Sequence, residues 1–385
     1  MLVLLILLGL ANLLWLRLFI LGIVSLRKRE YLDEAAEPVS TPLISIVVPA
    51  RNESRILSQT MEALAALDYP NYEVLIIDDH SEDNTYQLAA KFAENHPNFR
   101  PMKAAELPEG WRGKSWALQQ AVSFAQGNWM LFTDADIHLH PLALRKALAH
   151  AQKEKLDLLS VLPHLDCVTF WDRTILPSFA IILNIIKPLH ESNNPESRIA
   201  IASGGFILIK SMVFRHLGGY ESISEAIAED VKLAELFKYS GYKIKTVLTR
   251  SPMVRTRMYE NFRGLWEGLT RHAFEGSGYN PVKTTLAVCA GYFFMVAPAI
   301  LFVLGLIQHN WKLVSFCAFP VITMIGNQIQ VNRFWKIPAY YFLSFPIAVS
   351  IYGLMMLHSM ISYYFHGGNL WKGRRYRKEG PCEST

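Results

Sequence analysis

The sequence predicts an α/β domain with a mostly parallel sheet, flanked by an apolar N-terminal segment and an apolar C-terminal region. Three observations predict this class. The 385 residues are 51% hydrophobic and 18% charged, whereas an average soluble domain carries about 25% charged residues. The apolar excess is concentrated at the two ends of the chain, and the middle has an ordinary composition. In the middle, short β-branched runs alternate with helical stretches, as in βαβ units.

Composition also limits the classes of partner. The apolar content excludes a disordered chain, and the four cysteines have no paired spacing that would indicate a disulfide framework or a zinc site. The net charge of +5 comes from 38 Lys and Arg against 33 Asp and Glu. The basic residues gather beside the apolar segments, at 27–29 and 372–378. We therefore expect contacts with lipid headgroups and no nucleic-acid partner.

The first apolar segment, residues 1–26, contains one charged residue, Arg17, and is long enough to cross a bilayer as one helix. A cleaved signal peptide fits poorly, because no basic segment precedes the apolar stretch and no small-residue cleavage site follows it. Arg27, Lys28 and Arg29 come next. The positive-inside rule therefore predicts a transmembrane anchor with the downstream chain in the cytosol.

The C-terminal region, 284–366, contains three apolar runs, and a basic tail, 367–385, follows them. The middle run is the weakest, because it carries Asn327 and Gln328. Three crossings would leave the tail outside, whereas its basic residues favour the cytosol. Either the middle run does not cross or the last one bends back, and we expect a cytosolic tail. The runs are 284–307, 313–329 and 338–365.

A further apolar stretch, 174–189, is too short to predict a span. A single crossing here would also put Asp136 and Asp230 on opposite sides of the membrane. A buried core helix and a helix lying in the membrane interface are both compatible with it, and we favour the interface.

The middle of the chain, 42–274, is predicted to be one catalytic domain. Strands at 43–50 and 72–79 enclose a helix at 54–67, and a second unit joins a helix at 115–125 to the strand WMLF. Continuous apolar strands indicate a buried parallel sheet, in which ligands bind beyond the carboxyl ends of the strands. Polar residues follow three of these strands: Arg51, Asn52 and Glu53, then Asp78 and Asp79, then Asp134 and Asp136.

Two acidic motifs predict a metal site and a catalytic base. Asp134 and Asp136 are two apart on extended backbone, so they face the same way and could hold one Mg²⁺ or Mn²⁺ together with phosphate oxygens. Solvated turn aspartates are the alternative. Glu229 and Asp230 open an amphipathic helix, where carboxylates also serve as caps. The functional interpretation is that Asp230 is a general base for an incoming hydroxyl.

The succession of motifs over about residues 43–274 resembles the family 2 glycosyltransferases, which have a GT-A fold. The motifs are VVPARNE, IIDDHSEDNT, GWRGKSWALQQA, FTDAD, SGGFILIK and AED. The resemblance implies a UDP- or GDP-sugar donor, with Asp78 and Asp79 contacting base and ribose. It places the base near Pro49, Ala50, Arg51 and Glu53.

The same resemblance implies the remaining roles. Asp134 and Asp136 would hold the cation and the diphosphate, Lys114 would approach the diphosphate as a point charge, and Asp230 would be the catalytic base. A single base without a second nucleophilic carboxylate implies inversion. Residues expected on the acceptor side are Ser203, Gly204, Gly205, Glu229, Arg263 and Trp266.

One departure from the family bears on the acceptor. Processive polysaccharide synthases carry a Q-x-x-R-W signature, but Phe262 and Leu265 stand where Gln and Arg would be, and only Trp266 matches. With one N-terminal anchor and the ending WKGRRYRK, the chain more closely resembles membrane enzymes that glycosylate carotenoids or hopanoid lipids. We expect a multi-pass membrane hexosyltransferase with a cytosolic catalytic domain, which transfers the sugar to a hydroxyl or a carboxyl of a lipid acceptor. A processive exopolysaccharide synthase and a non-catalytic nucleotide-sugar binding or export partner are the alternatives.

Overall fold

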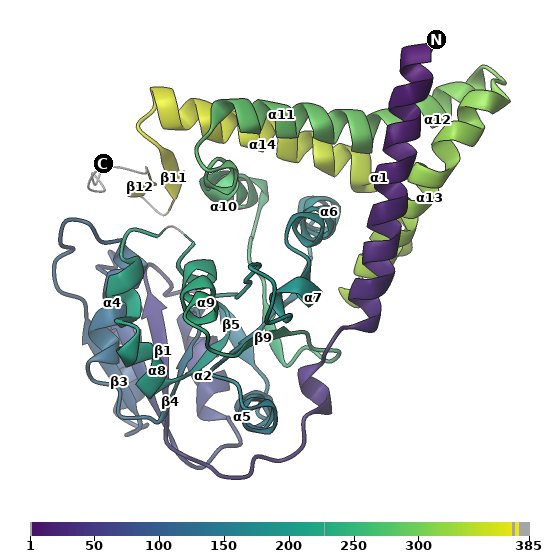
Figure 1. The fold of residues 1–385 in the computed structure, drawn as a ribbon. Coiled ribbons are helices and arrows are strands. Elements are labelled where there is room, and N and C mark those ends of the chain that lie inside the picture. The colour runs from purple at the N-terminus through teal and green to yellow at the C-terminus, as the bar shows by residue number, and fades with distance from the viewer. Residues whose placement is uncertain (1, 227, 372–373, 377–385) are drawn as a thin grey trace.

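The computed structural model describes residues 2–226, 228–371 and 374–376, and Figure 1 shows an α/β domain beneath a layer of long helices. The domain is built on a seven-stranded sheet. In spatial order its strands are β3 (Phe99–Lys103), β2 (Tyr72–Asp78), β1 (Ile44–Ala50), β4 (Trp129–Phe132), β8 (Ile207–Lys210), β6 (Leu158–Val161) and β9 (Ile244–Val247).

Pairing in this sheet brings the predicted polar ends together. β1 pairs in parallel with β2 and with β4, so that Ala50 lies beside Asp78 and Val47 beside Phe132. The carboxyl ends of the three strands therefore meet at one edge. β8 runs antiparallel to both β4 and β6, which makes the sheet mostly parallel. The predicted fold class is confirmed.

Helices cover both faces of the sheet. Successive strand residues such as Val47 and Val48 point to opposite sides, and both are fully buried. One face packs against α2 (Leu57–Ala65), α3 (Thr85–Ala93) and α5 (Ala143–Glu154). The other packs against α4 (Gly113–Val122), α8 (Ser211–His216) and α9 (Glu229–Tyr239). α2 begins three residues later than predicted. The N–H of Ser54, just before it, donates to Asp83 Oδ2 at 3.1 Å.

A small second sheet leads from the domain toward the helical layer. Its order is β5 (Ile137–Leu139), β10 (Val254–Thr256) and β7 (His164–Leu165). The short elements η1 (Leu32–Glu34), α7 (Leu189–Ser192), η2 (Gly219–Ile223) and η3 (Glu275–Ser277) connect the larger ones, and β11 (Asn369–Trp371) pairs with β12 (Arg374–Tyr376).

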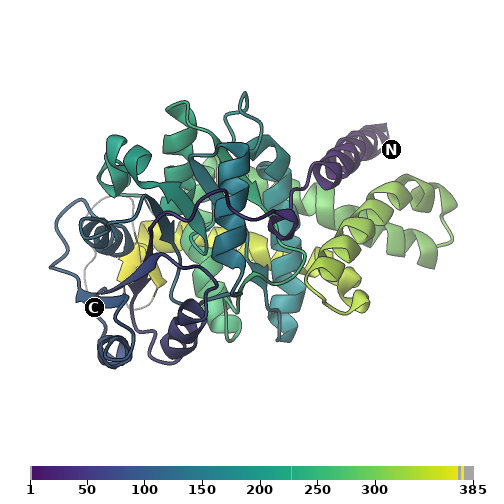
Figure 2. The same ribbon diagram turned by 90° about the horizontal axis from the view of Figure 1, so that it is seen from below.

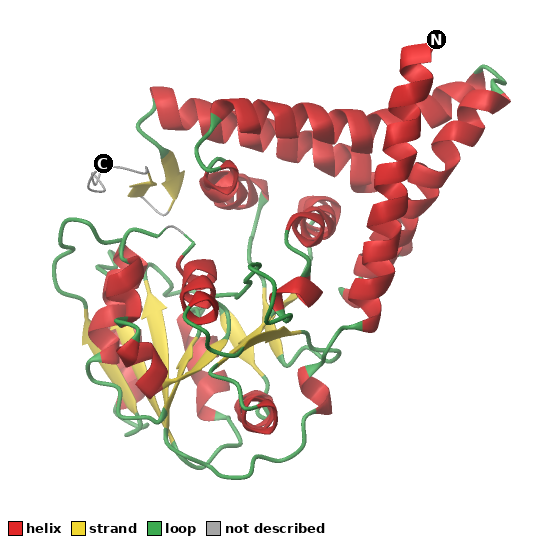
Figure 3. Ribbon diagram, in the orientation of Figure 1, coloured by secondary structure: helices red, strands yellow, loops and turns green. Residues whose placement is uncertain are grey.

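Among the residues that the structure describes, three helices of the helical layer are long and apolar enough to cross a membrane: Pro281–Ile307, Trp311–Phe334 and Ala339–Phe365. The first joins α11 (Pro281–Gly291), a π-helical turn (Tyr292–Val296) and α12 (Ala297–Ile307), and the others contain α13 (Trp311–Phe334) and α14 (Phe345–Phe365), the latter preceded by η5 (Ala339–Ser344). α1 (Leu2–Arg27) packs along α13. Figures 2 and 3 show that α1, α12 and α13 project beyond the α/β domain, with a short loop joining α12 to α13.

Two further helices lie between the domain and the long helices (Figure 1): α6 (Phe170–Ile186) and α10 (Phe262–Ala273). Both pack on α14 through a common apolar cluster that includes Ile175 and Leu265. α6 corresponds to the apolar stretch 174–189. It buries Ile175 but exposes Ile186 by 64%, so its predicted position in the membrane interface stays a prediction.

The carbonyl of Phe294, in the π-helical turn, has a hydrogen-bond partner on α1. Pro298 has no N–H, so it cannot donate to the carbonyl of Phe294 four residues earlier. The indole N–H of Trp15 donates to that carbonyl at 2.8 Å, and Trp15 is 1% exposed. α1 is thereby fixed to the long helix by a hydrogen bond in an apolar environment.

Candidate functional site

Four charged side chains converge where β4 ends and α4 and α9 begin. Lys114, in the first turn of α4, lies 2.6 Å from Asp134 Oδ1 and 2.6 Å from Glu229 Oε1. Asp230 follows Glu229 in the first turn of α9. Pro49 of β1 lines the same hollow. The structure thus brings together residues from four motifs that are far apart in the sequence.

Lys114 closes this hollow. Burial opposes its charge, but the ion pairs with Asp134 and Glu229 outweigh burial and raise the pKa of Lys114 well above its ordinary value. The hollow has a volume of about 10 Å³, which is room for about one water molecule. A ligand group larger than water that occupies the hollow must therefore displace side chains that line it.

Asp230 is held by backbone donors. The N–H of Gly204 donates to its Oδ2 at 2.9 Å, and the N–H of Val231 donates to its Oδ1 at 2.8 Å. Burial and then the neighbouring charge of Glu229 raise the pKa of Asp230, although Lys114 and both N–H groups act in the opposite direction. A raised pKa makes a carboxylate a better proton acceptor near neutral pH.

The loop from Ser203 to Gly205 fits tightly between these groups. A Cβ atom on Gly204 would lie 3.0 Å from Lys114 Nζ and 3.2 Å from Asp134 Oδ2. The carbonyl of Gly205 accepts a hydrogen bond from Thr133 Oγ1 at 2.9 Å. The small residues expected on the acceptor side therefore leave room for the lysine and position Asp230. Glu229, also expected there, contacts Lys114 instead.

Asp136 has a different partner from Asp134. Its Oδ2 accepts a hydrogen bond from Thr256 Oγ1 of β10 at 3.2 Å, and both aspartates are half-buried. Among the described residues no group of three or more His, Cys, Asp and Glu side chains could hold a metal ion. Two carboxylates still fit Mg²⁺ or Mn²⁺, because such ions commonly take their other ligands from substrate phosphates and water.

The ends of β1 and β2 form the second part of the edge. Asp78 and Asp79 are 6% and 5% exposed, and Arg51 Nη1 donates to the Asp79 carbonyl at 2.8 Å. The N–H of Ser81 donates to Asp78 Oδ2 at 3.3 Å, and His80 Nδ1 lies 3.3 Å from Asp79 Oδ1. Asp78 Oδ1 and Arg51 Nε are buried and have no hydrogen-bond partner in the part of the chain that the structure describes. Such atoms at a strand end are candidates for ligand contacts.

The neighbouring loop is locked by side chains. Asn52 has a left-handed backbone with φ of 53°, and its Oδ1 accepts the N–H of Glu82 at 2.8 Å. The N–H of Glu53 donates to Thr85 Oγ1 at 2.9 Å. Ala50 is buried at the end of β1. The structure therefore gathers all the residues expected near the base around one rigid turn.

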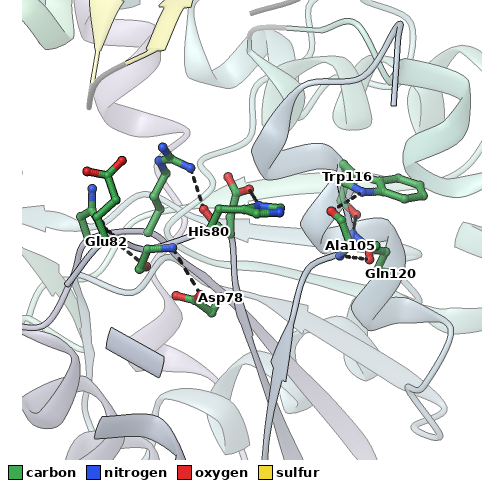
Figure 4. Close-up of polar contacts among 10 residues, drawn as sticks. Asp78, His80, Glu82, Ala105, Trp116 and Gln120 are labelled. Carbon is green, nitrogen blue, oxygen red and sulfur yellow. Dashed lines mark hydrogen bonds and ion pairs between the residues drawn. The ribbon is translucent and has the colours of Figure 1, made fainter. Parts of the chain in front are cut away.

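A second polar group lies across the ends of β2 and β3. Figure 4 shows Asp78, His80 and Glu82 on one side, and Ala105, Trp116 and Gln120 on the other. Trp116 Nε1 donates to the Ala105 carbonyl at 3.1 Å, and Gln120 Oε1 accepts the Ala105 N–H at 2.8 Å. The sequence analysis singled out only Lys114 in this motif. The two tryptophans in GWRGKSW, Trp111 and Trp116, were the sequence signal for this second group. Their ring centroids are 5.0 Å apart.

Tyr220 is another residue that the sequence analysis missed. It is 1% exposed, lines the hollow beside Lys114 and packs against Phe132. Burial raises its pKa well above the ordinary tyrosine value. The signal was the pair of glycines before it, because Gly218 and Gly219 have left-handed φ angles of 80° and 59° and so mark a structured turn.

Arg263 and Trp266 do not line this hollow. They lie on α10 and line a separate cavity of about 480 Å³ against α14. Trp266 Nε1 donates to His358 Nδ1 at 2.9 Å, and Arg263 pairs with Glu267 at 2.8 Å. The structure thus divides the expected acceptor-side residues between two places.

The mostly parallel sheet carries an Asp-x-Asp pair, a lysine and a helix-initial carboxylate at one edge, where ligands of open α/β sheets bind and where the resemblance to the GT-A fold places them. Residues 45–218 match the family described as Glycosyl transferase family 2. Residues 45–218 are therefore similar to the family 2 glycosyltransferases, and the prediction of a nucleotide-sugar-dependent transferase is confirmed at the level of this class.

Relatives and a solved structure agree with this assignment. The chain is 24% identical over 365 residues to a 4,4'-diaponeurosporenoate glycosyltransferase of Staphylococcus aureus, covering 92% of this chain and 94% of the relative. A beta-monoglucosyldiacylglycerol synthase of Trichormus variabilis is 34% identical over 143 residues, which are 37% of this chain and 30% of that protein. A mannosyltransferase from Pyrobaculum calidifontis, in complex with GDP-Man and Mn²⁺, has a TM-score of 0.51 and 17% identity over 91% of this chain and 94% of its own. This last likeness establishes the fold.

Proposed function

We propose that the protein is an inverting glycosyltransferase that moves a hexose from a UDP- or GDP-sugar to a membrane lipid, such as a carotenoid, a hopanoid or another glycolipid precursor. The observation that carries the proposal is the convergence of Lys114, Asp134, Glu229 and Asp230 on one hollow. Relatives named for a carotenoid acid and for a diacylglycerol product support a lipid acceptor.

In this mechanism the nucleoside lies over the ends of β1 and β2. Asp78 Oδ1 and Arg51 Nε, both buried without partners, accept from and donate to it. Lys114 leaves its ion pairs and contacts the diphosphate, whose negative charge replaces that of the carboxylates. Asp230 takes the proton of the acceptor hydroxyl as that oxygen attacks the anomeric carbon, and the nucleoside diphosphate leaves from the opposite face.

Asp134 and Asp136 would hold a divalent cation. When bound, the cation neutralises charge on the leaving diphosphate. Asp134 becomes available to a cation once Lys114 turns toward the diphosphate, and Asp136 is kept at the edge by Thr256. Chelation of divalent cations with EDTA is expected to abolish nucleotide binding measured by calorimetry, and Mn²⁺ should restore it; unchanged binding in EDTA would remove this role.

We place the domain in the cytosol. The basic residues Arg27, Lys28 and Arg29 follow α1 directly, which favours the cytosolic side for the chain after it. In this orientation the α/β domain meets nucleotide sugars in the cytosol while the acceptor stays in the bilayer.

The test supplies purified full-length protein in lipid nanodiscs with radiolabelled UDP-glucose or GDP-mannose and a carotenoid alcohol. Mass spectrometry should show an acceptor that has gained one hexose, and Asp230→Asn should abolish this product while nucleotide binding is kept. A polymeric product would identify a processive synthase instead. Binding of nucleotide without transfer to any lipid would identify a non-catalytic protein.

A further inference from the structure

Tyr220 lines the hollow at the sheet edge, but the mechanism proposed above gives it no role. Its backbone and its ring hold it in place. The N–H of Tyr220 donates to Gln119 Oε1 on α4 at 3.1 Å, and the centroids of the Phe132 and Phe214 rings lie 5.2 and 5.4 Å from that of Tyr220. None of these contacts uses the hydroxyl. The packing of this turn therefore requires an aromatic ring, which a phenylalanine would also supply.

The hydroxyl of Tyr220 lies among the charges of the hollow. Burial raises the pKa of Tyr220 well above its ordinary value, and the charge of Glu229 is the next largest cause. The hydroxyl is therefore protonated at neutral pH and can donate a hydrogen bond. Four charged residues act on it, and all four line the same hollow: Glu229, Lys114, Asp134 and Asp230.

This donor has no hydrogen-bond partner in the part of the chain that the structure describes. Tyr220 is 1% exposed, and the hollow of about 10 Å³ has room for about one water molecule. A buried hydroxyl without a protein partner makes the folded state less stable than an apolar ring of the same shape would. A different arrangement of the same hollow, in which the hydroxyl has a partner, would explain why it is there.

Glu229 is the residue that needs a new partner in the proposed mechanism. Lys114 Nζ lies 2.6 Å from Glu229 Oε1 here, but the lysine turns to the diphosphate when the donor binds. The side chain of Asp134 is 34% exposed and gains the cation, whereas that of Glu229 is 13% exposed and gains no ligand contact. A carboxylate that loses its partner away from solvent is strongly unfavourable.

We infer that Tyr220 is a positioning residue, which replaces Lys114 as the hydrogen-bond partner of Glu229 when the lysine contacts a nucleoside diphosphate. The hydroxyl donates to the Glu229 carboxylate directly or through one water molecule in the hollow. Glu229 thereby stays in place, and with it the first turn of α9, which also carries Asp230. The inference rests on the proposed function, for which it names the group that compensates the movement of the lysine.

Tyr220→Phe keeps the ring and removes only the hydroxyl. Binding of UDP and of GDP, each with Mn²⁺, is measured by calorimetry on the full-length protein in nanodiscs. For the nucleotide that the wild type binds, Tyr220→Phe should weaken affinity by about tenfold, because the bound state loses a hydrogen bond to a charged group. Tyr340→Phe, at a residue that is 66% exposed, is the matched control and should bind as the wild type does. Unchanged affinity in Tyr220→Phe would overturn the inference.

The Glu229→Gln background identifies the partner of the hydroxyl. A neutral amide does not need a replacement for the lysine, so Tyr220→Phe should change affinity by less than about twofold in this background. A tenfold loss in both backgrounds would show that the hydroxyl contacts the ligand itself, and would overturn the assignment to Glu229.

A second cycle tests the exchange of partners without any ligand. Lys114→Met removes the lysine permanently, so the hydroxyl of Tyr220 should pair with Glu229 in that background. Tyr220→Phe should then lower the midpoint of thermal unfolding by about 2–4 °C in Lys114→Met and should not lower it in the otherwise wild-type protein. Equal changes in the two backgrounds would contradict the exchange.

The two cycles separate this inference from the proposed function. Sugar transfer to a lipid by a protein in which Tyr220→Phe has no effect in either cycle would refute the inference and leave the proposed function standing. A stability coupling between Lys114 and Tyr220, in a protein that binds neither nucleotide, would support the exchange of partners and refute the proposed function.

Discussion

Two hollows in the described part of this protein differ in size and in the charge of their lining. The hollow at the sheet edge has a volume of about 10 Å³ and is filled by its own ion pairs, with Lys114 between Asp134 and Glu229. The cavity between α10 and α14 has a volume of about 480 Å³, and among the described residues Asn369 Oδ1 beside it has no hydrogen-bond partner. The first hollow is organised by charge. The second is much larger and is lined by aromatic and polar side chains.

Removal of Lys114 should have the largest effect on the charged hollow. Lys114→Met leaves Asp134 and Glu229 as an unpaired pair of carboxylates and removes the cation expected to contact the diphosphate. We expect nucleotide-sugar affinity to fall by about 10- to 100-fold, measured by calorimetry.

Lys114→Arg provides the control for charge alone. The planar guanidinium keeps the charge but cannot act as a compact point charge between two carboxylates, so it should restore only part of the affinity. Wild-type affinity in Lys114→Met would show that the donor does not enter this hollow.

Gly204→Ala tests how tightly the same hollow is packed. The added Cβ would lie 3.0 Å from Lys114 Nζ and 3.2 Å from Asp134 Oδ2, so both side chains must shift. We expect kcat to fall by about tenfold, because small displacements of catalytic groups are costly. Gly326→Ala on α13 is the control, since a Cβ there meets nothing within 4 Å. Equal activity of the two variants would contradict the packing argument.

The pH dependence of transfer tests how the charges of Glu229 and Lys114 affect the pKa of Asp230. A general base acts only when deprotonated, and burial together with Glu229 raises the pKa of Asp230. Activity should therefore be lost as pH falls through a pKa that lies above the ordinary aspartate value. Glu229→Gln removes a negative neighbour, so the acid limb of the kcat/KM profile should move to lower pH.

Lys114→Met should shift the acid limb of the pH profile in the opposite direction. Loss of the positive neighbour raises the pKa of Asp230 further, so its residual activity should have an acid limb at higher pH. If both substitutions move the limb in the same direction, Asp230 is not the group that titrates.

The two hollows also differ in how far the sequence could predict them. The edge of the sheet was predictable, because continuous apolar runs give β1, β2 and β4, and parallel strands necessarily deliver Asp78 and Asp134 to one edge. The pairing of Lys114 with Glu229 was not, because it depends on how α4 and α9 pack on the same face of the sheet. Each residue was a candidate alone, and only the fold joins them.

The cavity at α10 could be predicted even less well from the sequence. Trp266 and His358 are separated by 92 positions, and each lies in a segment that predicts only a helix. Their hydrogen bond, and the unpaired Thr270 nearby, follow from helix packing, which has no short motif. A lone histidine in an apolar run was the one available signal.

The smallest predicted effect concerns how α1 is attached to this helical layer. Trp15→Phe removes the indole donor from the Phe294 carbonyl, which Pro298 cannot serve, and should destabilise the detergent-solubilised protein by about 1–3 kcal/mol in denaturant unfolding. Trp311→Phe, at a residue that is 63% exposed, should be close to neutral. In a Pro298→Ala background the helix regains an N–H for that carbonyl, so Trp15→Phe should cost less there. Identical costs in both backgrounds would show that Trp15 stabilises α1 through packing and not through this hydrogen bond.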